Sequence, residues 1–332
     1  MHFDSYKKEV EVALAAVLEA ASLCQKVQAT VSPKMMEKKD RSPVTVADFG
    51  SQALVCRAIN EAFPDDPVIG EEDSHELRKP EKADLLAKVV SHVRVEREGA
   101  TTENILHWID IGGASKYAKR LWTLDPIDGT KGFLRKEQYA IALGLIENGK
   151  VVVAALCCPN LSTGSDSSET GVVFCAVRGE GTQSMNLGGT SASSVAVSTI
   201  SSTAKARFCE SVESGHSSHG DAAAVAEALG IQEDSVRLDS QAKYAIVARG
   251  DAEIYMRLPT RPGYVEKIWD HAAGMLVIEE AGGKVTDIHG NHLDFTHGIG
   301  LAKNNGVIAT NGLVHSDVLA ALSKTGVTER VV

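Results

Sequence analysis

Apolar side chains recur at every third or fourth position between Val10 and Val27, which predicts a long amphipathic helix near the start of the chain. Asp4 or Ser5 stands where the N-cap of this helix is expected. The alanine content of the helix permits close packing of its apolar face. The polar, proline-containing segment 32–42 then predicts a loop.

A second helix is predicted to begin at Asp48 and to stop before Pro64, with apolar residues along one side. Asp48 is expected to be its N-cap, and a capping carboxylate can also orient a water molecule. Val68 to Gly70 predicts a short buried strand, which three consecutive acidic residues follow. The charged segment 81–97 predicts another helix.

Leu121 to Leu124 predicts a buried strand that stops at Asp125, because a residue before proline disfavours helix and often ends an element. Two longer apolar runs, 139–146 and 150–157, flank Glu147-Asn148-Gly149. An Asn-Gly pair between apolar runs is typical of a β-hairpin.

The second half alternates strand and helix patterns, which favours an α/β layer arrangement. A boundary near residue 160 divides the chain into a 1–160 α+β domain and a 161–332 α/β domain. Strands are predicted at 172–177, 236–238, 252–258, 285 and 307–308, and helices at 222–229, 240–249, 270–280 and 315–322.

Composition narrows the class of protein. The 332 residues are 43% hydrophobic and 23% charged, which is ordinary for a soluble globular protein of two domains. A net charge of −10 argues against a duplex nucleic-acid partner. No apolar run is long enough to span a membrane, so no membrane partner is expected. Without a signal-peptide pattern, we expect a cytoplasmic protein.

Six cysteines stand at positions 24, 56, 157, 158, 175 and 209, and none forms a C-x-x-C pair. Disulfides are unusual in the cytosol, so the cysteines are expected to be small buried hydrophobic residues. Cys157 and Cys158 are adjacent on a predicted strand and should face opposite ways.

The candidate chemistry centres on Asp125-Pro126-Ile127-Asp128-Gly129-Thr130. Two carboxylates at a strand end suit Mg²⁺, and the amides that follow suit a phosphate. A surface turn is the alternative, since Asp, Pro and Gly are turn residues. Glu71 and Glu72 offer further ligands, and only one of them should face the site because neighbours on an extended chain point oppositely.

Further candidate site residues each have an alternative, purely structural interpretation. Asp270 could be a ligand or the N-cap of the helix behind it. His216 and His219 lie in a polar loop, where histidines are commonly solvent-facing but can also bind a ligand. Lys243 and Arg257 could be rim charges or phosphate anchors.

Three acidic motifs together resemble the inositol-monophosphatase-like superfamily of Mg²⁺-dependent, Li⁺-sensitive phosphatases. They are Glu71-Glu72, Asp125-Pro-Ile-Asp-Gly-Thr130 and Trp269-Asp-His-Ala-Ala-Gly274. Within it, the segments 42–48, 132–135, 215–219, 238–244 and 266–270 are similar to the 3′(2′),5′-bisphosphate nucleotidase family. The resemblance runs over nearly the whole chain, except for the loops at 74–120 and 160–171.

The resemblance implies a layered αβαβα sandwich, a monomer, and two to three Mg²⁺ ions. It places metal ligands at Glu71, Asp125, the Ile127 carbonyl, Asp128 and Asp270. The water-activating pair falls on Asp48 and Thr130. Substrate contacts fall on Gly129, Thr130, His216, Ser240, Lys243, Arg257 and Asp270.

The activity so implied is hydrolysis of adenosine 3′,5′-bisphosphate to AMP and phosphate, with 3′-phosphoadenylyl sulfate as a second substrate and a place in sulfur assimilation. Asp125 is expected to bridge two ions roughly 4 Å apart. Thr130, hydrogen-bonded to Asp48, is expected to take a proton from the attacking water.

Three alternatives stay open. An inositol mono- or polyphosphatase is the nearest. An aspartyl-phosphate phosphatase of the haloacid-dehalogenase type shares the look of the Asp125 motif, but the motif has one residue too many and lies far from the N-terminus. A non-catalytic nucleotide or cation sensor has no need for the Asp48–Thr130 pair.

Overall fold

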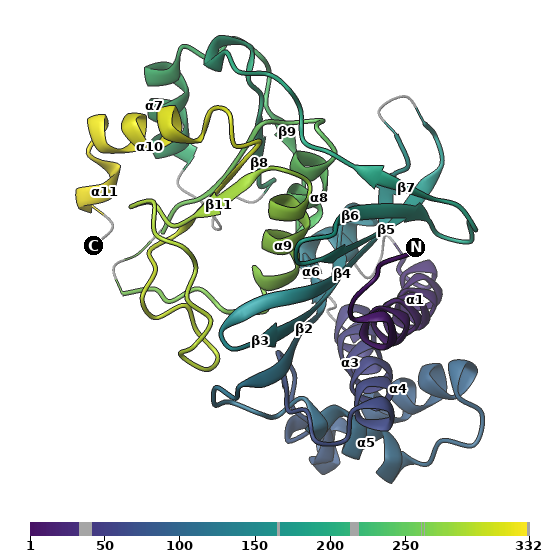
Figure 1. Ribbon diagram of the computed structural model, residues 1–332. Helices are drawn as coiled ribbons and strands as arrows, with labels where there is room; N and C mark the ends of the chain where they lie inside the picture. Colours follow the sequence, from purple (N-terminus) through teal and green to yellow (C-terminus); the bar gives the residue numbers. More distant parts are fainter. Residues whose placement is uncertain (33–41, 165–166, 213–218, 260, 262, 331–332) are drawn as a thin grey trace.

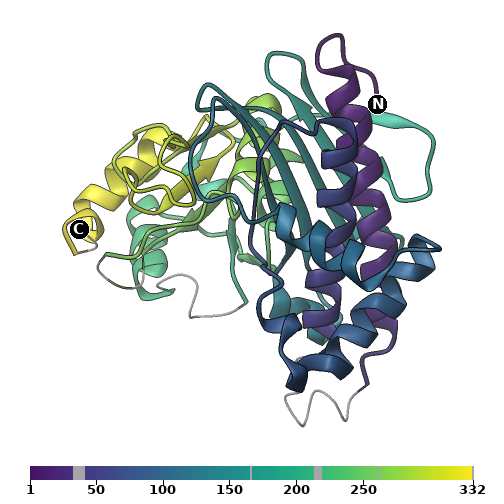
Figure 2. The ribbon, with the colours of Figure 1, turned by 90° about the horizontal axis from the view of Figure 1, so that it is seen from below.

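Helices and strands alternate in five layers in the computed structural model, which describes residues 1–32, 42–164, 167–212, 219–259, 261 and 263–330 (Figures 1 and 2). Three apolar clusters fill the spaces between neighbouring layers. The order is helices, seven-stranded sheet, helices, five-stranded sheet, helices. This confirms the predicted αβαβα sandwich.

The first helical layer packs on one face of the larger sheet. It consists of α1 (Lys7–Ala29), α3 (Ser42–Ala62), α4 (Ala83–Glu96) and α5 (Thr102–Ile111). The amphipathic stripe of α1 is buried against α3 and the sheet, as its period predicts. Helix α5 went unpredicted, although Thr101 and Asn104 form a reciprocal capping box at its start.

Two cap predictions in this layer are wrong. Neither Asp4 nor Ser5 caps α1, whose N-cap residue is Tyr6; the backbone amides of both residues instead donate to the Glu180 carboxylate. Asp48 is not an N-cap either, because α3 already begins at Ser42 and places Asp48 inside the helix. The loop predicted over 32–42 lies mostly outside the described residues.

The larger sheet has the strand order β1-β2-β3-β4-β5-β6-β7, with β1 parallel to β2 and every later neighbour antiparallel. Helices cover both faces of β3, β4 and β5, so these strands are apolar almost throughout. The strands are β1 (Val68–Gly70), β2 (Arg120–Asp128), β3 (Ala140–Glu147), β4 (Lys150–Ser162), β5 (Thr170–Val177), β6 (Gly181–Asn186) and β7 (Ala192–Val195).

The predicted hairpin joins β3 to β4. Asn148 and Gly149 both have positive φ, 51° and 78°, as the two central residues of a type I′ turn require. On β4, Cys157 faces the cluster beneath α1 and Cys158 faces the cluster on the opposite side of the sheet. All six cysteines are buried, which confirms the prediction for them.

The middle layer consists of α8 (Ala242–Ala248) and α9 (Ala272–Glu280), both buried between the two sheets. The smaller sheet has the order β11-β12-β10-β8-β9. Its strands are β8 (Phe208–Glu210), β9 (Val236–Arg237), β10 (Ile254–Arg257), β11 (Lys284–Thr286) and β12 (Val307–Thr310). Its outer face carries α7 (His219–Leu229), α10 (His315–Lys324) and the short α11 (Val327–Arg330).

The chain passes from the larger to the smaller sheet between β7 and β8. Position 160/161 falls within β4, because the long strands of the larger sheet continue past it. The division into domains 1–160 and 161–332 stays a prediction. The chain leaves the larger sheet for the smaller one only after β7, later than residue 160.

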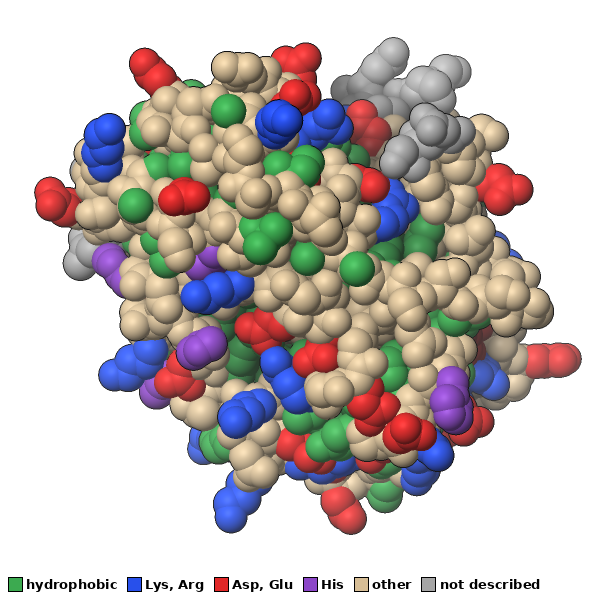
Figure 3. Space-filling view, turned by 45° about the horizontal axis from the view of Figure 1, so that its top comes forward, with side chains coloured by type: hydrophobic (Ala, Val, Ile, Leu, Met, Phe, Trp, Pro, Cys, Tyr) green, Lys and Arg blue, Asp and Glu red, His purple; other side chains and the backbone are tan. Residues whose placement is uncertain are grey.

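The surface carries both signs of charge. Acidic and basic side chains are interspersed over the face shown in Figure 3. Among the helices of the described residues, none has the length and apolarity to cross a bilayer. The cytoplasmic location stays a prediction.

Candidate functional site

A β-bulge brings the two aspartates of β2 to one side of the sheet. Residues three apart on a regular strand point to opposite faces. Here Asp125 pairs with Ala142 while Asp128 pairs with Ala140, so β2 carries one residue more than β3 over this stretch. Both carboxylates consequently line the same cavity. The strand was predicted to stop at Asp125, and the bulge is the reason that it continues to Asp128.

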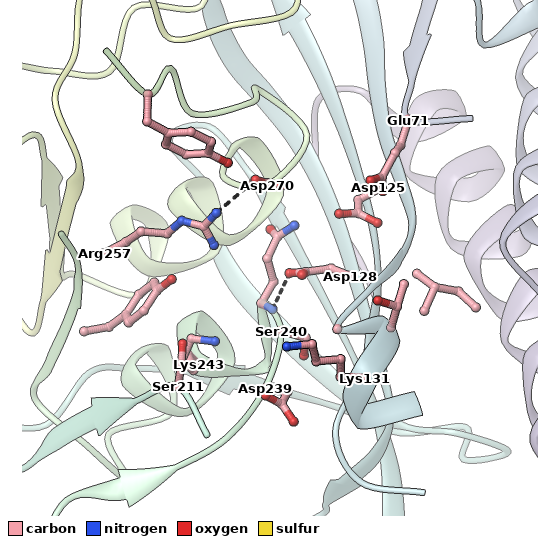
Figure 4. A pocket seen from close by; sticks show the side chains of 16 residues that line it. Glu71, Asp125, Asp128, Lys131, Ser211, Asp239, Ser240, Lys243, Arg257 and Asp270 are labelled. Atoms are coloured by element: carbon pink, nitrogen blue, oxygen red, sulfur yellow. Dashed lines mark hydrogen bonds and ion pairs between the residues drawn. The ribbon is translucent and has the colours of Figure 1, made fainter. Parts of the chain in front are cut away.

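Glu71 reaches this cavity from the neighbouring strand. Gly70 of β1 is the register partner of Leu124 in β2, so the next residue on each strand brings Glu71 beside Asp125. The two carboxyl groups are within hydrogen-bonding reach and point toward one another (Figure 4). Glu72 is not among the residues that line the cavity, in agreement with the prediction that only one of the two glutamates faces it.

Asp48 approaches the cluster from α3. Its side chain is buried, and in the part of the chain that the structure describes its Oδ1 atom has no hydrogen-bond partner. The charges of Glu72 and Glu71 act on it. Thr130 is exposed and begins α6 (Thr130–Arg135). The predicted Thr130–Asp48 hydrogen bond is not formed among the described residues.

The turn after Asp128 packs on a loop from the second half of the chain. Gly129 has φ 92°, and a Cβ at this position would lie 2.8 Å from the Cβ of Ser240. Only glycine therefore fits both the backbone conformation and the close contact. The backbone amide of Gln241 donates to the Asp128 carboxylate at 2.6 Å, which joins the two loops directly (Figure 4).

Asp270 lies on the opposite wall, just before α9. The N-cap position of α9 is His271 and makes no side-chain cap, so the alternative of Asp270 as a plain N-cap is wrong. Arg257, at the end of β10, contacts Asp270 with an N–O distance of 3.4 Å. Its Nε donates to the buried carboxylate of Glu266 at 2.9 Å, which fixes the guanidinium beside the cavity. His271 in turn links Glu266 to the Tyr244 hydroxyl.

Lys243 stands at the same wall as Arg257. Its side chain is buried, with Nζ 3.4 Å from the Leu238 carbonyl oxygen and over the ring of Tyr255. Burial lowers the pKa of Lys243, and the charge of Asp128 opposes that shift. Ser240, also predicted to contact substrate, has positive φ and lines the cavity.

Burial and mutual repulsion dominate the electrostatics of the carboxylates. Burial raises the pKa of Glu71 to about 8, and Asp270 and Glu72 add to the rise. Burial raises the pKa of Asp270 to about 6, although Arg257 opposes the shift. Asp125 has a pKa well above the usual range because it is fully buried and faces Glu71. The Asp125 Oδ1 atom also has no hydrogen-bond partner among the described residues.

Such a cluster fits hard divalent cations. Carboxylate oxygens are the donors that Mg²⁺ prefers, and among the described residues Asp48 and Asp125 each keep a buried oxygen without a hydrogen-bond partner. A bound cation would relieve the repulsion within the cluster. Glu71, Asp125, Ile127, Asp128 and Asp270, the five predicted ligand residues, all line one cavity of about 300 Å³.

The cavity has further walls that the sequence did not single out. Gly129, Thr130, Ser240, Lys243 and Arg257 line it as predicted, whereas His216 lies outside the described residues. The additional lining residues are Lys131, Ser211, Asp239, Gln241, Tyr255 and Tyr264. Tyr255 could have been found, since it stands two residues before Arg257 on a strand and shares its face.

Sequence comparison places this chain in a known family. The model of the inositol monophosphatase family matches residues 5–324. The chain belongs to the inositol monophosphatase family. This confirms the resemblance drawn from the three acidic motifs, and the family is generally Mg²⁺-dependent.

Relatives within the inositol monophosphatase family extend over almost the whole chain. A 3′(2′),5′-bisphosphate nucleotidase of Emericella nidulans is 44% identical, with 96% of this chain and 99% of the relative covered. The nucleotidase of Schizosaccharomyces pombe is 43% identical, with 96% and 95% covered. The 3′(2′),5′-bisphosphate nucleotidase 1 of Arabidopsis thaliana is 44% identical over 84% of this chain and 85% of its own.

Solved structures of inositol monophosphatases share the fold. That of Zymomonas mobilis has a TM-score of 0.64 at 18% identity and covers 97% of this chain and 100% of its own. That of Anabaena has a TM-score of 0.62 at 20% identity, with 96% of each chain covered.

Proposed function

We propose that this chain is a Mg²⁺-dependent phosphatase that hydrolyses the 3′-phosphate of adenosine 3′,5′-bisphosphate to give AMP and phosphate. The observation that carries the proposal is a cavity with two chemically different walls. Glu71, Asp125 and Asp128 line one wall, and Lys243 and Arg257 stand on the other, where Arg257 contacts Asp270. A substrate with two phosphates can place one at each wall. The names of the relatives support this reading.

The acidic wall would hold the metal ions together with Asp270, which faces it from the opposite wall. Glu71, Asp125 and the Ile127 carbonyl are proposed ligands of one ion, and Asp125, Asp128 and Asp270 of a second, with a weaker third near Glu71. When bound, such ions lower the pKa of a water molecule and stabilise the attacking and leaving oxygens of a phosphoryl transfer. Inhibition by Li⁺ is part of the proposal.

Asp48 and Thr130 are proposed to take the proton of the attacking water. The buried Asp48 Oδ1 has no other partner among the described residues and is free to accept it. The Thr130 hydroxyl must approach Asp48 for this step, and catalytic hydrogen bonds often tighten only in the substrate complex. The amides of Gly129 and Thr130 are proposed to contact the phosphoryl oxygens.

The basic wall would bind the rest of the substrate. Arg257 is held by Glu266, so its fork of donors is fixed before a ligand arrives. Lys243 supplies a second charge from a buried position. Together with Ser240 and His216 they are proposed to hold the 5′-phosphate and the nucleoside. The sulfated analogue, 3′-phosphoadenylyl sulfate, keeps an anion at this end and is a proposed second substrate.

A substrate panel tests the proposal. Phosphate release is measured with Mg²⁺ on adenosine 3′,5′-bisphosphate, 3′-phosphoadenylyl sulfate, inositol monophosphate and an inositol polyphosphate, each with and without Li⁺. We expect kcat/KM to be highest for the two nucleotides and to fall when Li⁺ is added. A preference for an inositol phosphate would instead establish the inositol phosphatase alternative, which the fold permits.

The same assay separates the remaining alternatives. A trapped aspartyl-phosphate would indicate the haloacid-dehalogenase type of chemistry. Binding of nucleotide without any phosphate release would indicate a sensor. The number of metal ions and the monomeric state stay predictions, to be measured by metal analysis and light scattering.

A further inference from the structure

Gln52 makes a set of contacts that the proposed chemistry does not use. It lies on α3, one helical turn after Asp48, and its side chain is fully buried. Its Oε1 accepts a hydrogen bond from the Glu72 amide at 3.0 Å. Its Nε2 donates to the Glu72 carbonyl oxygen and, at 3.0 Å, to the Ile109 carbonyl oxygen. The carboxamide therefore pairs with both the backbone amide and the carbonyl oxygen of Glu72, the residue next to Glu71, as a neighbouring β-strand would.

Two glycines leave the space for this carboxamide. A Cβ on Gly70 would lie 2.6 Å from Oε1 of Gln52, and one on Gly112 would lie 2.5 Å from its Nε2. The amide of Gly70 also donates to the Gly112 carbonyl oxygen at 2.8 Å. The end of β1 and the segment after α5 are thus closed around one side chain. Any larger residue at either glycine would displace it.

The neighbouring residue of α3 holds the other acidic segment. The Ser51 hydroxyl donates to the Pro126 carbonyl oxygen at 2.8 Å, between Asp125 and Asp128 on β2. Adjacent residues of one helix are therefore hydrogen-bonded to the two segments that carry Glu71 and the β2 aspartates, and Asp48 is on the same helix.

The carboxylates need such support. Glu71 and Asp125 face one another across hydrogen-bonding distance, with Asp128 and Asp270 around the same cavity. Like charges in a buried site repel, so the backbone that carries them must be held from outside the cluster.

We propose that Gln52, assisted by Ser51, is a positioning residue that fixes Glu71 against the β2 aspartates for metal binding, a role that rests on the proposed metal-dependent phosphatase function. The rival is a merely structural role, in which the buried hydrogen bonds stabilise the fold and leave metal affinity unchanged.

Asn311 offers a matched control for that rival. It is also a buried carboxamide that holds a loop, with Nδ2 donating to the Ser198 and Ile200 carbonyl oxygens. Its Oδ1 accepts from the amides of Leu313 and Val314. Asn311 does not line the cavity.

The experiment uses the full-length, metal-free protein and Mn²⁺ as the probe. Free Mn²⁺ is followed by electron paramagnetic resonance for the wild type, Gln52→Leu, Ser51→Ala and Asn311→Leu, and the Tm of each metal-free protein is recorded. We expect Gln52→Leu to raise the Kd for Mn²⁺ about tenfold, equivalent to about 1.4 kcal/mol. Ser51→Ala should raise it by a smaller factor. Asn311→Leu should lower Tm and leave the Kd within about twofold of wild type.

Kinetics give a second readout. The Mg²⁺ concentration for half-maximal activity should rise in Gln52→Leu, while kcat at saturating Mg²⁺ stays close to that of the wild type. An unchanged Mn²⁺ Kd in Gln52→Leu, or an equal loss of affinity in Asn311→Leu, overturns the positioning role. If Gln52→Leu does not fold, Ser51→Ala decides, and an unchanged Kd there overturns it as well. A wild type that binds no Mn²⁺ would instead refute the proposed function.

Discussion

The two walls of the cavity handle buried charge in opposite ways. On the wall built from β1, β2 and α3, the carboxylates of Asp48, Glu71 and Asp125 crowd together, and burial and the neighbouring acidic charges raise the pKa of each. On the other wall, Glu266 is as buried as Asp48 and Asp125, but His271 and Arg257 lower its pKa to about 2. One wall has a surplus of negative charge, whereas on the other Arg257 balances part of the charge of Glu266 and Asp270.

This difference separates the tasks of the two walls. Buried like charges are costly unless something external balances them, so the acidic wall is suited to binding cations. On the paired wall only Asp270 is proposed to contribute a metal ligand, because Glu266 is already paired with Arg257 and His271. The ion pairs of this wall hold Arg257 in place at the cavity, which suits recognition of an anionic group with fixed geometry.

Neutralising the acidic wall should have the largest effect on activity. Asp125→Asn keeps the size of the side chain but removes the charge proposed to bridge two ions. We expect kcat/KM for adenosine 3′,5′-bisphosphate to fall by about 10³-fold, the upper range for loss of one transition-state stabiliser. Circular dichroism should show a folded protein. Retained activity would refute the bridging role.

The same type of substitution should affect stability with opposite sign on the two walls. Glu266→Gln removes the partner of Arg257 and His271 and should destabilise the fold by about 3 kcal/mol, as breaking a buried ion pair does. Asp125→Asn should raise the Tm of the metal-free protein because it relieves repulsion. Thermal unfolding in the presence of a chelator measures both. If both substitutions lowered the stability, or both raised it, the proposed contrast between the two walls would be wrong.

Arg257 tests whether the paired wall recognises the second anion. Arg257→Ala should raise KM for adenosine 3′,5′-bisphosphate about a hundredfold, the loss of one buried charge-assisted contact of roughly 3 kcal/mol. KM for inositol monophosphate, which lacks a second phosphate, should change much less. Arg249→Ala serves as a control, because Arg249 pairs with Asp251 and does not line the cavity. Equal effects of Arg257→Ala on both substrates would contradict the assignment.

His315 provides a reference outside both walls. It is buried beside the hydroxyls of Thr286 and Thr310, and burial, aided by the charge of Lys284, lowers its pKa to about 4. The unfolded chain takes up this proton near pH 6.5, so stability is lost as pH falls from 6.5 toward 4. At pH 5 the loss should be about 2 kcal/mol. Chemical denaturation of the wild type and His315→Gln between pH 7 and 5 measures it, and an equal acid sensitivity in both would contradict this origin.

The sequence by itself determined the local elements and the chemistry on offer. The helical period of residues 10–27, the Asn148-Gly149 turn and the continuous apolar strands are encoded by neighbouring residues. The three acidic motifs predicted the family, which the family comparison confirms, and they offered hard oxygen donors as candidate metal ligands.

Only the tertiary structure decided how these groups meet. The bulge between Asp125 and Asp128 arises from pairing with β3, so the spacing of the motif could not reveal that both face one cavity. The sequence predicted Asp48 to be an N-cap, whereas the structure places it inside α3, which begins at Ser42. Its burial there depends on the layers packed around the helix. Arg257 pairs with Glu266, and Gln52 hydrogen-bonds to the backbone of Glu72. Both contacts join residues that lie on different segments of the chain. Such contacts follow from packing, which local patterns of hydrophobicity do not specify.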